Sequence, residues 1–302
     1  MQSIWQQLSK EISEQVARAG RSVVAVDGRG GHTSSGIVWT PEYVLTSAAS
    51  VRQDRDIGIV LESGNRVRAR LAGRDSGSGV ALLKLDQKAD AVPAEFAPTD
   101  SLAVGNLVVA IARTRRGNIV ASSGILSGLM GEWQMGPIRI DQFIRPDLTL
   151  YSGFSGGALI GPEGKILGMT SAEFLRGRSI AIPSSTLVKV AEELSAKGHV
   201  ATPYIGLVMQ PVSIPEKLQK QSNVGASTGL LVMHVETNGP ADTSGVFLGD
   251  ILLDLDGHSF EDLGDLQIVL RRLGAGQNVK AVLLRGGNKI ELTVNIGERP
   301  LR

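Results

Sequence analysis

The sequence predicts a mainly β protein made of a larger, strand-rich unit and a smaller α+β unit. Glycine accounts for 37 of the 302 residues and aromatic residues for only 4%, a composition typical of turn-rich β structure. About a dozen short apolar runs, broken by Gly, Asp, Ser and Pro, lie between residues 21 and 183. After residue 197 the pattern changes, because strand runs now alternate with helical ones. The chain therefore divides into two domains.

The first expected element is an amphipathic helix at residues 4–17, within an N-terminal segment 1–20 that Gly20 ends. Its apolar residues recur every four positions and so share one helical face; they are Ile4, Leu8, Ile12 and Val16. The polar face mixes acidic and basic side chains, whereas a helix on a membrane surface is usually basic. We expect the helix to pack against its own fold or a sister subunit.

The larger unit is expected at residues 21–196. Its predicted strands are SVVAV (22–26), SGIVW (35–39), YVLTSAASV (43–51), IGIVL (57–61), RVRARLAG (66–73), GVALLKL (79–85), LVVAIA (107–112), GILSGL (124–129), QFIRPDL (142–148), GALIG (157–161), KILGMTSA (165–172) and SIAIP (179–183). Strands at roughly 8–14-residue spacing indicate an all-β barrel or sandwich pair. A helix at about 184–197 closes the unit, with Gly198 as its C-terminal stop.

The smaller unit is expected at residues 204–298, after a linker at 197–203. The predicted strands are YIGLVMQPV, GLLVMHVE, GDILLDLDG, VKAVLLRGG and KIELTVNIG. A short helix around 215–221 and a longer one at 262–273 complete a small α+β domain.

Composition excludes several classes of function. Lys and Arg number 31 and Asp and Glu 30, so the charge balance opposes bulk binding to nucleic acid or anionic lipid. Without cysteine, disulfides, thiolate metal sites and a cysteine nucleophile are absent. No zinc spacing, phosphate loop or dinucleotide fingerprint occurs, so we expect no metal and no cofactor. We expect no transmembrane segment and, since no signal peptide is seen, a cytoplasmic location; an incomplete N-terminus would instead fit a periplasmic or extracytoplasmic one.

The most informative motif is the glycine-rich string from Gly153 to Leu159, GFSGGAL. A tight turn of this kind exposes the Ser155 Oγ and aims the backbone N–H groups of Gly153 and Ser155 at one point, as an oxyanion hole requires. The simpler interpretation is a plain glycine turn, in which Ser155 persists because a small residue fits.

The chain resembles the HtrA (DegP-like) family of serine proteases along nearly its whole length. The matching segments, in order, are SGIVWTPEYVLTSAASV (35–51), AGRDSGSGVALLKLD (72–86), FIRPDLTLYSGFSGGALIGPEGKILGMTSA (143–172), SIAIPSST (179–186), YIGL (204–207) and NGPADTSGVFLGDILLDLDG (238–257). The resemblance implies a trypsin-like (chymotrypsin-fold) domain of two six-stranded β-barrels, followed by a peptide-binding PDZ domain.

The departures from the family pattern concern the catalytic residues. The position of the triad histidine holds Ala49, and that of the triad aspartate holds Gly79. The nucleophile position keeps Ser155, but its usual Asn neighbour is Phe154, which we expect to fill part of the cleft or lie on its rim. A serine needs a base within hydrogen-bond reach and a group that orients that base. The resemblance therefore indicates a pseudoprotease.

An active protease would need a substitute base. The histidines are His32, His199, His234 and His258, and none falls where the resemblance brings it beside Ser155. Asp75 would reach only if its loop rearranged. The alternative function is thus an active HtrA-type endopeptidase in protein quality control that uses a non-standard base. A third possibility is a scaffold whose peptide groove is closed as well.

The PDZ resemblance implies a second site, where a peptide C-terminus adds a strand to a sheet. The carboxylate-binding loop would be Tyr204, Ile205, Gly206 and Leu207, with Val208 continuing the pairing strand. Leu266 and Leu270 on the 262–273 helix are expected in the groove, with core packing as the alternative. The implied partners are C-terminal peptides or unfolded proteins, and assembly as a homotrimer or with active relatives.

Overall fold

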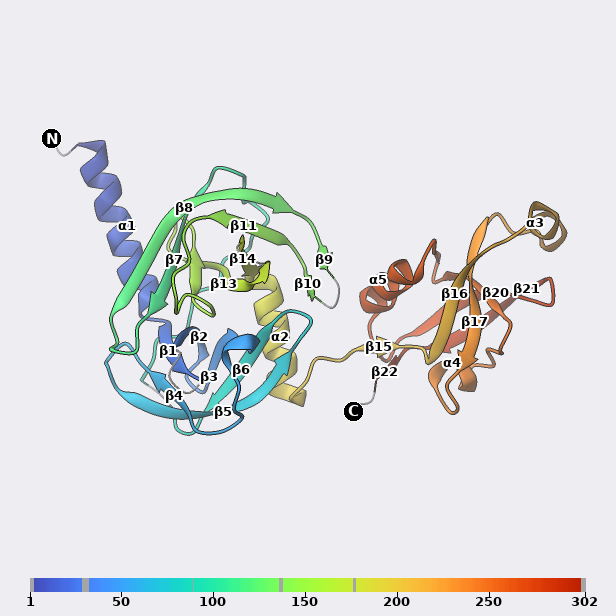
Figure 1. The fold of residues 1–302 in the computed structure, drawn as a ribbon, viewed down its shortest axis with the longest axis horizontal. Helices are drawn as coiled ribbons and strands as arrows, with labels where there is room; N and C mark the ends of the chain where they lie inside the picture. Colours follow the sequence, from blue (N-terminus) through green and yellow to red (C-terminus); the bar gives the residue numbers. More distant parts are fainter. Residues whose placement is uncertain (1–2, 29–32, 89, 136–137, 176–177, 300–302) are drawn as a thin grey trace. The chain divides into compact units, whose positions relative to one another are not determined.

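A computed structural model describes residues 3–28, 33–88, 90–135, 138–175 and 178–299. The chain forms two compact units, Met1–Val200 and Ala201–Arg302, which are described separately (Figure 1).

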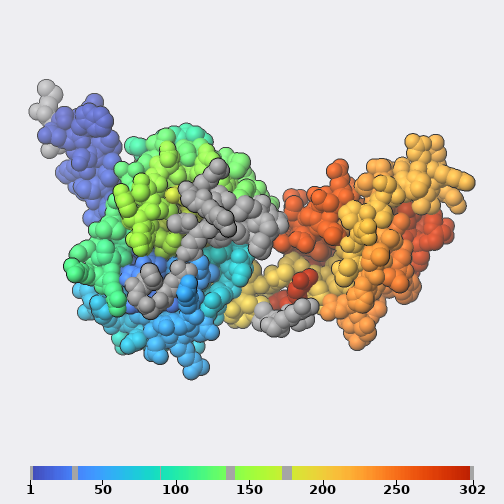
Figure 2. All heavy atoms as spheres, in the orientation of Figure 1, coloured from blue at the N-terminus to red at the C-terminus, as the bar shows by residue number. Residues whose placement is uncertain are grey.

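The chain begins with helix α1 (Ile4–Gly20), three residues longer than expected. Ser3 starts it with a capping box: the Ser3 Oγ accepts from the Gln6 N–H and the Gln6 side chain accepts from the Ser3 N–H. Ile4 and Trp5 are 82% and 80% exposed, and the only fully buried residues lie in the last turn. Figure 2 shows this helix standing out from the barrels.

Six antiparallel strands close the first barrel, in the order β1-β2-β3-β6-β5-β4. They are β1 (Val23–Asp27), β2 (Ser34–Thr40), β3 (Tyr43–Ser47), β4 (Ile57–Val60), β5 (Arg66–Asp75) and β6 (Val80–Leu85). Alternate side chains point inward because successive strand residues face opposite sides; this is clearest in β5, where Val67 and Ala69 are buried between exposed arginines.

The second barrel closes in the order β11-β14-β13-β12-β7-β8. Its strands are β7 (Leu107–Arg113), β8 (Ile119–Met130), β11 (Phe143–Asp147), β12 (Ala158–Ile160), β13 (Ile166–Leu175) and β14 (Arg178–Pro183). A hairpin of β9 (Trp133–Met135) and β10 (Ile138–Ile140) was not expected from the sequence. Helix α2 (Ser184–Lys197) packs on strands of both barrels and ends at Gly198, whose φ is 78°.

The second unit is built on a sheet with the strand order β16-β17-β18-β20-β21, with the short β19 paired to β18. Its strands are β15 (Pro203–Tyr204), β16 (Leu207–Ser213), β17 (Thr228–Val235), β18 (Ile251–Leu255), β19 (His258–Ser259), β20 (Asn278–Arg285), β21 (Asn288–Asn295) and β22 (Gly297–Glu298). Its helices are α3 (Glu216–Ser222), α4 (Pro240–Thr243) and α5 (Leu263–Leu273).

The predicted fold class is confirmed: a pair of six-stranded barrels precedes a small α+β domain. The twelve apolar runs of the larger unit all contribute to its two barrels. Elements that the sequence pattern missed are short, namely β9, β10, β15, β19, β22 and α4.

Candidate functional site

The nucleophile motif folds into two consecutive tight turns. The Phe154 N–H donates to the Tyr151 carbonyl at 3.1 Å, and the Gly157 N–H donates to the Phe154 carbonyl at 2.9 Å. The third residue of each turn is a glycine in the left-handed region, with φ of 97° at Gly153 and 84° at Gly156. Such angles favour glycine because a Cβ would clash with the backbone. Ser155 lies half-buried between them.

Both barrels hold these turns in place. From β2, the Ser35 N–H donates to the Ser155 carbonyl at 3.0 Å, and the Ser35 Oγ donates to the Gly153 carbonyl at 2.8 Å. From β13, the Thr170 Oγ1 donates to the Phe154 carbonyl at 2.6 Å, and its carbonyl accepts from the Gly156 N–H at 2.9 Å. The motif therefore lies at the junction of the barrels, where the resemblance requires a nucleophile.

Ser35 is a site residue that the sequence reasoning missed. Its Oγ also accepts from the Arg113 N–H at 3.0 Å, so one hydroxyl joins β7 to the nucleophile turns. The Arg113 guanidinium is buried and donates to the carbonyls of Val23, Gly117 and Gly20 at 2.5–2.7 Å. Burial lowers the pKa of Arg113, and the nearby Glu62 partly opposes this. The available signal was a serine at the start of the apolar run 35–39.

The two positions that the resemblance assigns to the triad histidine and aspartate are neighbours. Ala49 lies in a 3₁₀ turn directly after β3, and Gly79 directly precedes β6. Strands β3 and β6 pair, and the Ala48 N–H donates to the Gly79 carbonyl at 2.8 Å. Neither Ala49 nor Gly79 carries a titratable side chain, so these positions supply neither a base nor a group to orient one.

Phe154 is buried, contrary to expectation. It is 1% exposed and belongs to the core of the second barrel, in a cluster with Leu126 and Leu159. Its ring centroid lies 6.1 Å from that of Tyr151. The prediction that Phe154 fills the cleft or lies on its rim is therefore wrong, because the turn directs this side chain into the barrel.

The groups considered as a substitute base are two in the first unit, Asp75 and His199, two in the second unit and one outside the described residues. The Asp75 carboxylate accepts from the N–H groups of Gly77 at 3.1 Å and Ser78 at 2.8 Å, and so closes its own loop. His199 follows α2, where its Nδ1 lies 3.1 Å from the Lys197 carbonyl oxygen. His234 and His258 belong to the second unit. His32 lies outside the described residues.

The second unit offers a free sheet edge beside a glycine loop. Gly206 has a φ of 75°, and its carbonyl accepts from the Glu236 N–H at 2.8 Å. Ile205 is buried, and its carbonyl accepts from the Ala241 N–H at 2.9 Å. Leu207 begins β16, the edge strand, on which Val208 is 57% exposed. An extended peptide can pair with such an edge.

Helix α5 contacts β15 and β16. Leu266 and Leu270 are 3% and 6% exposed and belong to the core cluster that also holds Ile205. These leucines thus pack in the core behind the loop. Tyr204 carries the Arg299 guanidinium over its ring, 5.9 Å from the ring centroid.

Within the described residues, no group of three or more His, Asp or Glu side chains is arranged to hold a metal ion. In that same part of the chain, no helix has both the length and the apolarity to cross a membrane.

Two family models match the chain. Residues 34–169 match the trypsin-like peptidase domain, and residues 203–296 match the PDZ domain. These ranges contain the nucleophile turns and the Gly206 loop.

Curated relatives carry protease names. The probable periplasmic serine endoprotease DegP-like of Halomonas elongata is 30% identical over 85% of this chain and 54% of its own length. That of Ectopseudomonas mendocina is 32% identical over 87% and 56%. The serine protease Do-like HtrA of Lactobacillus helveticus is 27% identical over 87% and 68%. The chain spans about half the length of the DegP-like relatives. Their periplasmic names do not support the expected cytoplasmic location.

Solved structures agree in fold. The HtrA-type protease AlgW with decapeptide matches with a TM-score of 0.75 at 25% identity, covering 96% of this chain and 99% of its own. The serine endoprotease from Yersinia pestis matches with a TM-score of 0.72 at 25% identity, covering 95% and 98%. Together with the barrel pair, the nucleophile turns and the Gly206 loop, these matches show that the chain belongs to the HtrA/DegP family, with a trypsin-like peptidase domain followed by a PDZ domain.

Proposed function

We propose that this chain is a non-catalytic member of its family and that it works by binding peptide. The observation that carries the proposal is the identity of the two residues beside the nucleophile turns, Ala49 and Gly79. Because these two positions supply no base to remove its proton, we expect the Ser155 hydroxyl to be a poor nucleophile. Loss of triad members leaves only a residual acceleration of about 10³–10⁴ over water, far below that of a working protease.

The test is proteolysis of unfolded casein by the purified chain, with Ser155→Ala as the matched control. We expect equal, background rates from both proteins, and no labelling of Ser155 by a fluorophosphonate probe. Turnover that disappears in Ser155→Ala would favour the alternative, an HtrA-type endopeptidase that uses a non-standard base in protein quality control. The protease names of the curated relatives are what keep that alternative under test.

The proposed binding site for C-terminal peptides is the groove along β16. Support comes from the positive φ of Gly206, which lets the loop turn N–H groups toward a carboxylate, and from the unpaired side of an edge strand. A solved relative is named as a complex with a decapeptide. Calorimetry with acid and amide forms of one peptide tests the assignment. Equal affinities would instead favour the scaffold function, in which the loop does not bind the peptide carboxylate.

Assembly and location complete the proposal. Helix α1 presents its exposed apolar residues beside a groove that Ile119 and Ala121 of β8 also line, which suits packing against sister subunits as a homotrimer or against active relatives. We also propose a periplasmic location, in line with the names of the curated relatives. Light scattering of the purified chain and cell fractionation test these two points.

A further inference from the structure

A polar pocket lies on the outside of the first barrel. It has a volume of about 370 Å³ and crosses β1, β4 and β5. Register brings Asp27, Gly58 and Arg68 into one row across these strands, and Val60 and Arg66 into the next. Gly58 has no side chain, and a Cβ there would meet only the Cβ of Asp27, at 3.6 Å. The pocket is therefore hollow because glycine occupies the middle of the row.

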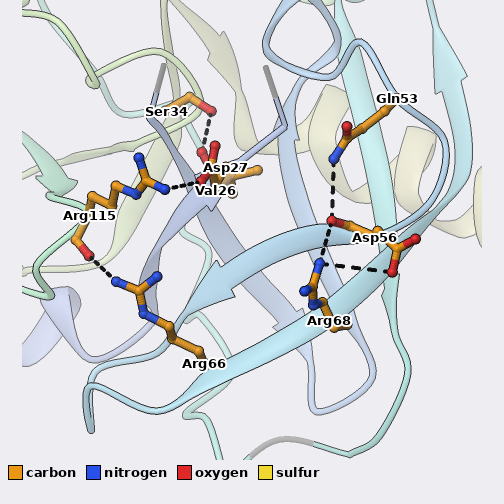
Figure 3. A network of polar contacts seen from close by, with 8 residues as sticks. All are labelled: Val26, Asp27, Ser34, Gln53, Asp56, Arg66, Arg68 and Arg115. Carbon is orange, nitrogen blue, oxygen red and sulfur yellow. Dashed lines mark hydrogen bonds and ion pairs between the residues drawn. The ribbon is translucent and has the colours of Figure 1, made fainter. Parts of the chain in front are cut away.

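Three arginines and two aspartates line this pocket (Figure 3). The Arg115 guanidinium pairs with the Asp27 Oδ2 at 3.1 Å. The Arg68 guanidinium donates to the Asp56 carbonyl at 3.1 Å and lies 3.9 Å from its carboxylate. Arg66 reaches only the Arg115 carbonyl, at 3.5 Å, and has no carboxylate partner within the described chain. One cationic group is thus left over after the two pairs are formed.

Asp27 adds a hydrogen-bond acceptor to the cationic donor that Arg66 provides. Its Oδ1 is buried and has no hydrogen-bond donor within the described chain. A buried acceptor without a donor carries a desolvation penalty that a ligand can relieve. The pocket therefore presents an unpaired guanidinium and an unpaired acceptor, and a ligand that fits both must carry an anion and an N–H donor.

The pocket adjoins the nucleophile turns. Thr33 lines it, and the Thr33 carbonyl oxygen lies 3.5 Å from where a Cβ on Gly153 would be. A chain segment lying across the nucleophile turns thus has the pocket within reach.

We infer that this pocket binds an acidic side chain of an extended peptide. The carboxylate would accept from Arg66 and Arg68, and a backbone N–H beside it would donate to the Asp27 Oδ1. A carboxylate suits the planar guanidinium fork. Free phosphate offers the same anion chemistry and an O–H donor, but the Asp27 carboxylate would repel a dianion more strongly than it repels a single carboxylate. The inference concerns the barrel domain alone and does not depend on the loss of catalysis or on peptide binding by the PDZ domain.

The test uses fluorescence anisotropy with a fluorescein-labelled Gly-Glu repeat heptapeptide whose C-terminus is amidated, so that a carboxylate-reading loop does not hold it. The full-length chain should bind this peptide more tightly than the matched Gly-Gln peptide. We expect Arg66→Gln to weaken binding roughly threefold to tenfold, the scale of one partly exposed charge-assisted contact. Gly58→Leu fills the pocket and should weaken binding at least as much.

The matched control is Arg70→Gln, because Arg70 is an exposed arginine on the same strand that does not line the pocket. It should leave the affinity unchanged. Equal weakening by Arg70→Gln would mean diffuse charge attraction, and equal binding of the Gly-Gln peptide would mean no anion recognition; either result overturns the inference. Displacement of the peptide by inorganic phosphate at a concentration similar to that of the peptide would also overturn the inference, because it would indicate a simple anion site. Unchanged thermal unfolding of each variant excludes misfolding as the cause.

Discussion

The two sites inherited from the family differ in which chemical groups their functions require. The peptidase site keeps its backbone, because the turns around Ser155 are formed and both barrels hold them, yet its chemistry needs side chains that Ala49 and Gly79 do not provide. The proposed PDZ groove would need chiefly backbone groups, which the Gly206 loop and the edge of β16 are placed to supply. A site made of backbone survives any substitution that preserves the turn, whereas a catalytic site fails when one side chain is lost.

The largest expected effect tests how firmly the barrels hold the nucleophile turns. In Gly156→Ala, the new Cβ would lie 2.1 Å from the Ser35 carbonyl oxygen and 2.6 Å from the Thr46 Oγ1, at a φ of 84°. We expect a loss of about 4 kcal/mol in the free energy of unfolding, as for severe core and backbone lesions. Chemical denaturation followed by tryptophan fluorescence measures this.

Gly64→Ala is the matched control, since Gly64 has a φ of 83° but nothing within 4 Å of its Cβ position. It should cost only the backbone term of about 1–2 kcal/mol. Equal losses in the two variants would mean that the contacts between the turn and β2 contribute little.

The next largest expected effect concerns the stability of the PDZ domain, to which the Asp250–Arg285 pair contributes. Asp250 is 1% exposed and accepts two hydrogen bonds from Arg285, at 2.8 and 2.7 Å, and one from the Phe247 N–H at 2.8 Å. We expect Asp250→Ala to lower the stability of this domain by about 2–3 kcal/mol, below the range for fully buried pairs because Arg285 keeps partial access to water. Differential scanning calorimetry should show one lowered transition; a lowered barrel transition would contradict this.

The pH dependence of the Asp250–Arg285 pair follows from the direction in which the pKa of Arg285 is shifted. The hydrogen bond from Arg285 to Asp250 raises the pKa of the guanidinium above its ordinary value. A base with a raised pKa contributes stability that is fully present below its unfolded pKa and is lost only as pH rises through the folded value. On the arginine side, the contribution should therefore stay constant between pH 6 and pH 10.

The sequence predicted most of the fold, because barrel strands and amphipathic helices leave periodic patterns. Helix α2 begins and ends where expected, since Gly198 allows the left-handed stop. The strands that were missed are two or three residues long, too short for a period to show. The site positions were identified through motifs, but the direction of Phe154 was not, because the preceding turn sets it. Ser35 escaped notice because its role depends on contacts with residues 78 and 118 positions away along the chain.

A smaller expected effect tests the contribution of the loop of the PDZ groove separately from that of its sheet edge. Gly206→Val would place a Cβ 3.3 Å from the Glu236 Cβ and 3.4 Å from the Pro240 Cδ, at a φ of 75°. We expect about 1–2 kcal/mol of backbone strain and roughly tenfold weaker binding of acid peptides, as for loss of a charge-assisted hydrogen bond. Calorimetry measures the binding. Gly249→Ala, at a φ of 88° with open space around it, controls for strain alone and should bind normally.

The smallest expected effect is a gain of proteolytic activity. Ala49→His combined with Gly79→Asp would restore both missing triad groups, and we expect casein cleavage only slightly above the background of the same variant carrying Ser155→Ala. Phe154 does not set this limit, because it is buried in the second barrel. The limit lies at Gly79, whose φ is 72° and whose N–H donates to the Asp75 carbonyl at 2.9 Å while its carbonyl accepts from Ala48.

An aspartate held in that left-handed conformation carries a strain of about 1–2 kcal/mol, and its carboxylate leaves the backbone in a different direction from one on an extended residue. The new histidine would then be poorly oriented, and a general base without its orienting partner loses most of its effect. Ala49→His alone should therefore cleave nearly as fast as the double variant. A double variant that is faster by a factor of a hundred or more would show that the loop at Gly79 relaxes freely and that the side chains at positions 49 and 79 alone limit the rate.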